Sequence, residues 1–251
     1  MNIEITEDYS HMAVYGQKAY VGTIDALYIV DLSTLATQKI NLDDGVESIY
    51  PGETTYVSTN SKLLTIVNDK VSSIIDLPNG SELLKCNNDK LYLYDRCNRS
   101  VCEYETGEVV AQNENYKPCC YGSNLYFHEE RGYTVFNTVT GEKEFHSLPG
   151  PVDRMYAGEN ANVFFYGEHF IIGVEQNGVF KFIDCGEEQL VDVSIYKGRV
   201  VTLTTDNKIR VIENVEVTRE FENDEDVFVI SQDESHIYYV GVDQTLHVID
   251  L

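Results

Sequence analysis

The chain contains 251 residues, a size that suits one large domain or two small ones. Its hydrophobic content of 43% excludes a disordered chain, and its 18 tyrosines, against 3 methionines and no tryptophan, favour β-strands. The formal net charge of −24 opposes binding to nucleic-acid backbones and to anionic membrane surfaces. A binding partner is therefore expected to be basic, with solubility as the alternative meaning of the charge.

The start of the sequence, MNIEITEDYS, has no apolar run and does not predict a secretory signal. No stretch approaches the length of apolar sequence that spans a membrane. We therefore expect an intracellular protein of the cytoplasm or nucleus, whose six cysteines remain thiols. A zinc site made by Cys97, Cys102 and the Cys119–Cys120 pair is the alternative use of these cysteines.

Along the chain, short strands recur about every 36 residues, which indicates a repeat architecture. The first repeat predicts strands over 18–23, 27–31 and 37–42, preceded by a further short run. Apolar runs like KAYVGT (18–23) recur at 54–59, 90–95, 124–129, 162–167, 199–204 and 236–241. Each is followed by a strand that ends on an acidic or amide residue: Asp31, Asn68, Glu105, Asn137, Glu175, Glu213 and Asp250.

A more polar, alternating run follows each of the first six of these pairs, at 37–42, 72–77, 108–113, 142–147, 179–184 and 217–222. Alternation predicts a half-exposed strand, whereas the apolar runs predict strands covered on both faces. Gly107 and Gly141 lie in TGE turns between the third and fourth strands, where a positive φ is needed. The residue that ends each third strand is expected to accept hydrogen bonds from its turn.

Four short strands repeated seven times predict an all-β chain folded as a seven-bladed β-propeller, a single domain over residues 1–251. The stretch AYVGTIDALYIVDLSTLATQKI (19–40) resembles a blade of the WD40 and YVTN-type propellers, as do TGEVV and TGEKEF. The resemblance is divergent, because the chain has no tryptophan and hence no Trp-Asp dipeptide. It covers nearly the whole chain.

The seventh repeat ends at LHVID without a fourth strand, while NIEITE (2–7) is left over before the first repeat. We predict that residues 2–7 form a strand that completes the seventh blade, with Ile3 and Ile5 packed inward beside Leu246 and Val248. This pairing would protect an edge strand that otherwise invites aggregation.

The propeller resemblance implies that the loops from each fourth strand to the next first strand share a face with the loops between second and third strands. These loops contain roughly twice as many acidic residues as the loops of the opposite face. The predicted binding residues are Asp43, Asp44, Glu129, Glu130, Arg154, Tyr156, Asp224, Glu225 and Asp226. Carboxylates steer cationic partners, and Arg and Tyr are favoured anchors; ordinary strand packing is the alternative role for the tyrosine.

No catalytic motif is evident, and the six histidines are scattered. We therefore predict a non-catalytic interaction scaffold without a cofactor or metal. It would be monomeric within a larger complex and would bind a basic peptide or Lys/Arg-rich surface, such as that of ribosomal proteins or histones. One alternative is an enzyme or metal-binding protein that uses the central channel of the propeller. Another is a subunit held in a complex by a blade edge or side surface.

Overall fold

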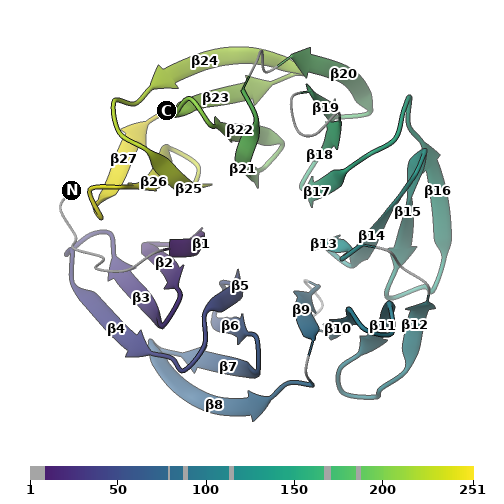
Figure 1. Cartoon of the computed structure of the whole chain (residues 1–251), viewed down its shortest axis with the longest axis horizontal. Helices are drawn as coiled ribbons and strands as arrows, with labels where there is room; N and C mark the ends of the chain where they lie inside the picture. Colours follow the sequence, from purple (N-terminus) through teal and green to yellow (C-terminus); the bar gives the residue numbers. More distant parts are fainter. Residues whose placement is uncertain (1–8, 79, 87–89, 113–115, 167–170, 185–187) are drawn as a thin grey trace. The chain divides into compact units, whose positions relative to one another are not determined.

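A computed structural model describes residues 9–78, 80–86, 90–112, 116–166, 171–184 and 188–251. Strands make up the regular structure of these residues, which contain no helix and so none able to cross a membrane. The strands form seven antiparallel sheets, in each of which strands consecutive in sequence are neighbours. This organisation, visible in Figure 1, is that of a seven-bladed β-propeller and confirms the predicted fold class.

The chain divides into two compact units, unit 1 with Met1–Leu83 and Asn223–Leu251, and unit 2 with Leu84–Glu222. In unit 1 the first sheet contains β1 (Tyr9–Tyr15), β2 (Lys18–Thr23), β3 (Ala26–Asp31) and β4 (Thr37–Asn41). The second contains β5 (Val46–Tyr50), β6 (Thr54–Thr59), β7 (Lys62–Val67) and β8 (Lys70–Asp76). The seventh contains β25 (Val227–Gln232), β26 (His236–Gly241) and β27 (Leu246–Asp250).

The division between the units falls inside β9 (Ser81–Lys85), which begins the third sheet with β10 (Leu91–Asp95), β11 (Ser100–Glu103) and β12 (Val109–Gln112). The fourth contains β13 (Cys119–Tyr121), β14 (Asn124–Glu129), β15 (Gly132–Asn137) and β16 (Lys143–Ser147). The fifth contains β17 (Arg154–Gly158), β18 (Ala161–Tyr166), β19 (Ile171–Gln176) and β20 (Val179–Asp184). The sixth contains β21 (Leu190–Tyr196), β22 (Arg199–Thr204), β23 (Lys208–Glu213) and β24 (Glu216–Glu222).

Burial in the second strands follows the prediction, whereas two of the fourth strands are more exposed than the half-exposed, alternating strands that the sequence predicts. In β2 and β22, every residue after the first is buried, as expected for second strands that carry apolar side chains on both faces. In β8, by contrast, all seven residues are exposed, and most residues of β24 are exposed as well. The second strands thus form the packed layer of each unit, and the polar fourth strands face solvent.

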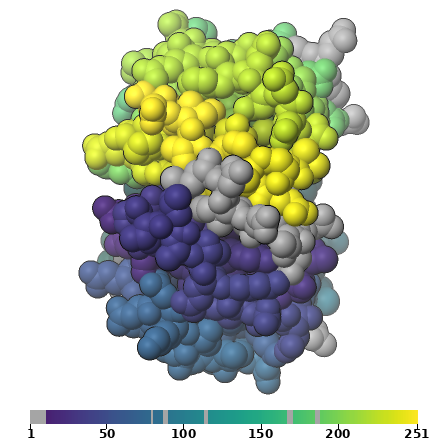
Figure 2. Space-filling view, turned by 90° about the vertical axis from the view of Figure 1, so that its left-hand side faces the viewer, coloured from purple at the N-terminus to yellow at the C-terminus, as the bar shows by residue number. Residues whose placement is uncertain are grey.

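The first and seventh sheets pack against each other in unit 1. Val240 and Leu246 of the seventh sheet share one buried cluster with Val21 and Val30 of the first sheet. Figure 2 shows the seventh sheet, in yellow, adjoining the first sheet, in purple. The predicted strand over residues 2–7, with Ile3 and Ile5, lies outside the described residues, so its pairing with β27 stays a prediction.

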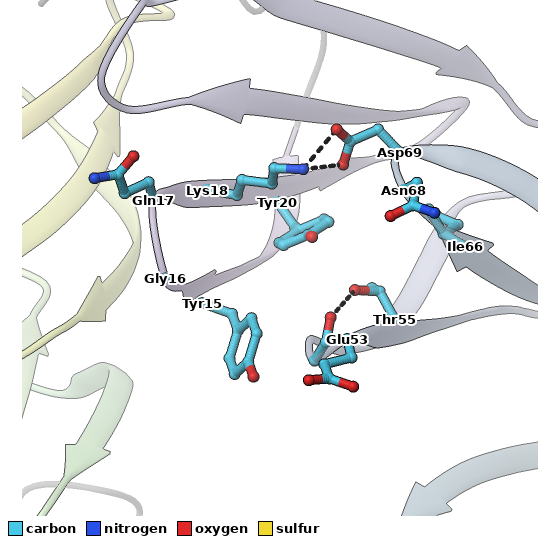
Figure 3. Close-up of a pocket in the computed structure, with 11 residues that line it drawn as sticks. Tyr15, Gly16, Gln17, Lys18, Tyr20, Glu53, Thr55, Ile66, Asn68 and Asp69 are labelled. Carbon is cyan, nitrogen blue, oxygen red and sulfur yellow. Dashed lines mark hydrogen bonds and ion pairs between the residues drawn. The ribbon is translucent and has the colours of Figure 1, made fainter.

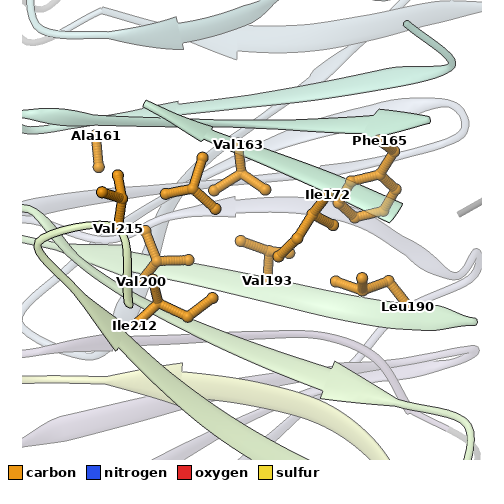
Figure 4. Close-up of a cluster of buried hydrophobic side chains, with 10 residues drawn as sticks. Ala161, Val163, Phe165, Ile172, Leu190, Val193, Val200, Ile212 and Val215 are labelled. Carbon is orange, nitrogen blue, oxygen red and sulfur yellow. The ribbon is translucent and has the colours of Figure 1, made fainter. Parts of the chain in front are cut away.

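In unit 2, the fifth and sixth sheets pack face to face through aliphatic side chains (Figure 4). Phe165 and Ile172 of the fifth sheet and Val200 and Ile212 of the sixth are all fully buried in this cluster. Their β-branched and aromatic shapes suit a pleated surface that is covered on both faces. Each sheet therefore depends on its neighbour for the burial of its apolar face.

The predicted turn chemistry is present between the third and fourth strands. Gly107 and Gly141 have φ values of 70° and 75°. The Asp31 carboxylate accepts hydrogen bonds from the Ser33 hydroxyl at 2.6 Å and the Thr34 N–H at 2.8 Å, and these bonds lower the pKa of Asp31 to about 2. Asn137 Oδ1 likewise accepts from the N–H groups of Val139 and Thr140, both at 2.9 Å.

Glu175 has different hydrogen-bond partners from those of Asp31 and Asn137. Its carboxylate accepts a hydrogen bond from the Tyr133 hydroxyl at 2.9 Å and another from Asn162 Nδ2 at 3.1 Å. Tyr133 belongs to the fourth sheet and Asn162 to the fifth. The carboxylate thus joins two neighbouring sheets of unit 2.

Candidate functional site

Two classes of connection share one face in each unit, which we call the loop face. These are the loops from a fourth strand to the next first strand and the loops between second and third strands. In unit 1, the Leu42 N–H donates to the Asp25 carbonyl at 2.7 Å, and the Val242 N–H donates to the Asp226 carbonyl at 2.8 Å. In unit 2, the Leu148 N–H donates to the Arg131 carbonyl at 3.0 Å. These contacts confirm the grouping of loops that the propeller resemblance implies.

Asp43 and Asp44 lie in the β4–β5 loop of unit 1 and both have local partners. Lys62 Nζ lies 2.5 Å from Asp43 Oδ2, and its hydrogen bond lowers the pKa of Asp43. The Ser61 hydroxyl donates to Asp44. Because the positive charge of Lys62 neutralises Asp43, this loop contributes less negative charge to the loop face than its sequence suggests.

The β24–β25 loop of unit 1 carries Asp224, Glu225 and Asp226, and all three are exposed. Among the described residues, Asp224 and Glu225 form no ion pair. Glu222, two residues before Asp224, is also exposed, but its carboxylate lies 3.8 Å from Lys208 Nζ. Asp224 and Glu225 are therefore the strongest source of unmatched negative charge among the predicted site residues of unit 1.

Sequence reasoning missed Phe228, which lies directly beside this acidic segment. In the pairing of β25 with β26, Val227 faces Gly241 and Val229 faces Val240, so Phe228 is the extra residue of a β-bulge. Its side chain is 43% exposed, although Val227 and Val229 on either side are each only 4% exposed. An exposed aromatic ring next to unmatched carboxylates gives the loop face an apolar anchor point.

The same bulge occurs near the start of other first strands. The extra residue is Ser10 in β1, Glu47 in β5 and Val191 in β21. These positions are equivalent in the repeat, so an alignment of the repeats could have placed Phe228 in the same class.

The remaining predicted site residues lie in unit 2. Glu129 ends β14 and Glu130 follows it in the β14–β15 loop, and both are exposed. Glu129 accepts a hydrogen bond from Thr134 at 2.5 Å. Arg154 opens β17 and is exposed, with its guanidinium 5.0 Å from the centroid of the Tyr156 ring. Their role as binding residues stays a prediction.

Tyr156 is half-buried and its ring lies against Phe165, with the centroids 5.4 Å apart. Burial raises the pKa of the Tyr156 hydroxyl to about 12, so the phenol stays protonated at neutral pH. Its side chain packs against the buried cluster of the fifth and sixth sheets. Tyr156 therefore has the alternative role, strand packing. The same ring also contacts the Arg154 guanidinium.

The described residues contain no cluster of side chains typical of a metal site. Within them, no three His, Cys, Asp or Glu side chains converge as a metal site would require. The five cysteines in this part of the chain form no disulfide, and Cys185 lies outside it. Cys86 is buried and the Cys120 thiol donates to the Lys85 carbonyl at 2.9 Å, both inside the packing of the third and fourth sheets.

No protein-family model matches the sequence, and no curated protein is significantly similar to it. Solved structures are similar in fold. A chain of the mitotic checkpoint complex matches with a TM-score of 0.77 at 11% identity, over 100% of this chain and 93% of that chain. The β-propeller domain of Cps50 (Swd1) from Myceliophteria thermophila matches with a TM-score of 0.74 at 13% identity, over 100% of this chain and 98% of that chain.

Hsv2 from Kluyvelomyces marxianus also matches, with a TM-score of 0.68 at 10% identity, over 97% of this chain and 96% of that chain. At identities this low, the likeness shows the fold and nothing further. The chain has a β-propeller fold like theirs, as its repeats predicted.

Proposed function

We propose that this protein is a non-catalytic interaction scaffold whose loop face binds a basic peptide or a Lys/Arg-rich protein surface. In this proposal the protein acts as a monomer within a larger complex inside the cell, in the cytoplasm or nucleus. Ribosomal proteins and histones are examples of partners with suitable charge. Steering by carboxylates would speed association, and an aromatic anchor would hold the bound partner.

The observation that carries the proposal is that the exposed Phe228 ring lies only a few residues along the chain from the exposed carboxylates of Asp224 and Glu225. The two carboxylates have no ion-pair partner among the described residues, and the Phe228 ring is 43% exposed at the bulge beside them. Interface hot spots combine such an anchor with surrounding complementary charge. The net charge of −24 supports a basic partner over the whole surface.

The comparisons support a scaffold in a general way. One similar solved structure is of a complex, the mitotic checkpoint complex, so this fold does occur in a multi-protein assembly. No observation on the described residues favours catalysis over binding.

Affinity capture from cell extract, followed by mass spectrometry, tests the proposal. The loop-face variant combines Asp224→Asn, Glu225→Gln and Asp226→Asn. The matched control combines Glu105→Gln, Glu108→Gln and Glu142→Gln, which removes the same charge from exposed positions of unit 2. We expect the wild-type protein to capture basic proteins, and the loop-face variant to recover them at least about tenfold less well than the control.

Two results would contradict the proposal. One is capture of mainly acidic partners by the wild-type protein. The other is equal recovery by the loop-face variant and the control, which would favour a subunit held by a side surface of its sheets.

A further inference from the structure

Unit 1 has a pocket on the face opposite the loop face, with a volume of about 290 Å³. Three turns surround it, namely β1–β2, β5–β6 and β7–β8, and it lies between the first and second sheets (Figure 3). Its walls include Tyr15, Lys18, Tyr20, Glu53, Thr55 and Asp69. The pocket volume is close to the lower limit for ligand pockets and is large enough for one long side chain.

The charges of the pocket do not cancel. Lys18 Nζ lies 2.5 Å from each carboxylate oxygen of Asp69, and this hydrogen bonding raises the pKa of Lys18. Lys18 therefore forms an ion pair with Asp69, and their opposite charges neutralise each other. Glu53 is exposed and forms no ion pair within the described residues, so the unmatched charge of the lining is negative.

Two tyrosine rings accompany this carboxylate. Tyr20 is 4% exposed and forms a fixed wall, whereas Tyr15 is 49% exposed at the mouth. Figure 3 shows the Tyr15 ring and the Glu53 carboxylate on opposite sides of the opening, with Tyr20 behind it. The faces of aromatic rings attract cations, and a carboxylate next to them adds a hydrogen-bond acceptor.

We propose that this pocket binds the guanidinium group of an arginine side chain from a peptide. The guanidinium would stack on the Tyr15 ring and donate two parallel hydrogen bonds to Glu53. Arginine fits this arrangement better than lysine, because its planar fork matches a carboxylate and its plane stacks on an aromatic ring.

A second pocket, also of about 290 Å³, shares Gly16 and Gln17 with the first and continues across the β1–β2 turn to Asp233, His236 and Tyr238. The Tyr238 hydroxyl donates to Asp233 at 2.7 Å, so this part of the surface is already ordered. The continuation provides room for the peptide that carries the arginine. The site lies on the other face of unit 1 from Asp224 and Glu225, so it does not depend on the function proposed for the loop face.

Protein-observed NMR with 13C-labelled tyrosine tests this site, using the peptide acetyl-Gly-Arg-Gly-amide as the probe. Tyr15→Phe identifies the Tyr15 signal, since it removes one resonance and keeps a ring. We expect saturable shifts of Tyr15 and Tyr20, and no saturable shift with the peptide in which neutral citrulline replaces arginine. Glu53→Gln should weaken binding by about tenfold or more, as expected for a lost charge-assisted pair.

The loop-face variant serves as the control and should bind the arginine peptide within about twofold of the wild-type protein. Glu53 is exposed, so its substitution is expected to leave the fold intact, which the unchanged remaining tyrosine signals verify. The proposal is overturned by equal shifts with the citrulline peptide, or by unchanged affinity in Glu53→Gln. Loss of binding in the loop-face variant alone would place the arginine on the other face.

Discussion

Substitution of Gln176 by glutamate is expected to lower the unfolding free energy by about 3–5 kcal/mol at neutral pH, in the range for a disrupted buried polar network. Gln176 is 2% exposed and ends β19 of the fifth sheet. Its Nε2 donates to the Gly198 carbonyl at 2.6 Å and the Ile212 carbonyl at 3.1 Å. Its Oε1 accepts from the Val215 N–H, so one side chain satisfies three backbone groups of the sixth sheet.

A carboxylate at this position keeps the acceptor for Val215 but loses both donors, and it faces two carbonyl oxygens. Burial and those carbonyls would raise the pKa of the introduced carboxyl group above its value in the unfolded chain. The folded state then binds more protons than the unfolded state, so the stability of Gln176→Glu should fall as pH rises through the acidic range. Urea unfolding followed by circular dichroism at pH 5 and pH 8 measures this.

Gln112→Glu is the matched control, because Gln112 is exposed at the end of β12. It should change stability by no more than about 0.5 kcal/mol. A Gln176→Glu protein within about 1 kcal/mol of wild type at pH 8 would show that the three hydrogen bonds do not join the sheets as described.

Leu246→Ala is the second large effect, with an expected loss of about 2–5 kcal/mol for a truncated core leucine. Leu246 is fully buried in β27, yet it packs in one cluster with Ala19, Val21 and Val30 of the first sheet. The cavity left by the substitution is therefore expected to lower the stability of the first and seventh sheets together. Native-state hydrogen exchange should show faster opening in β2 and β3 as well as in β26 and β27.

Val242→Ala provides the comparison, because Val242 is 54% exposed beside the same strand. Its exchange pattern should match that of the wild-type protein. If Leu246→Ala accelerates exchange in β26 and β27 but leaves β2 and β3 protected, the first and seventh sheets do not form one cooperative core.

The repeat made the fold predictable from sequence. Because each sheet must bury the same faces, apolar strands recur at equivalent places, and the turn residues Asp31 and Asn137 and the glycines Gly107 and Gly141 recur with them. Such features are local, so a sequence shows them directly. The same repetition predicted that the acidic segment Asp224–Asp226 lies in the same class of loops as other acidic residues.

The sequence could not show in the same way which charged side chains form ion pairs with each other. Lys18 pairs with Asp69 and Lys62 with Asp43, and these partners are far apart in sequence and meet only when sheets pack. They cancel charges that sequence counts as available. Phe228 is the extra residue of a bulge, which depends on the register between two paired strands and is therefore not visible in the sequence of one strand.

The salt dependence of partner binding tests the central claim most directly. The dissociation constant of the basic partner captured by the loop face would be measured from about 50 to 300 mM NaCl, a range over which screening between exposed charges increases strongly. We predict affinity that weakens by about tenfold or more over this range, with a much smaller change for the Asp224→Asn, Glu225→Gln and Asp226→Asn variant. An affinity that stays constant with salt, or that weakens equally in the variant, would contradict binding through the acidic loop face.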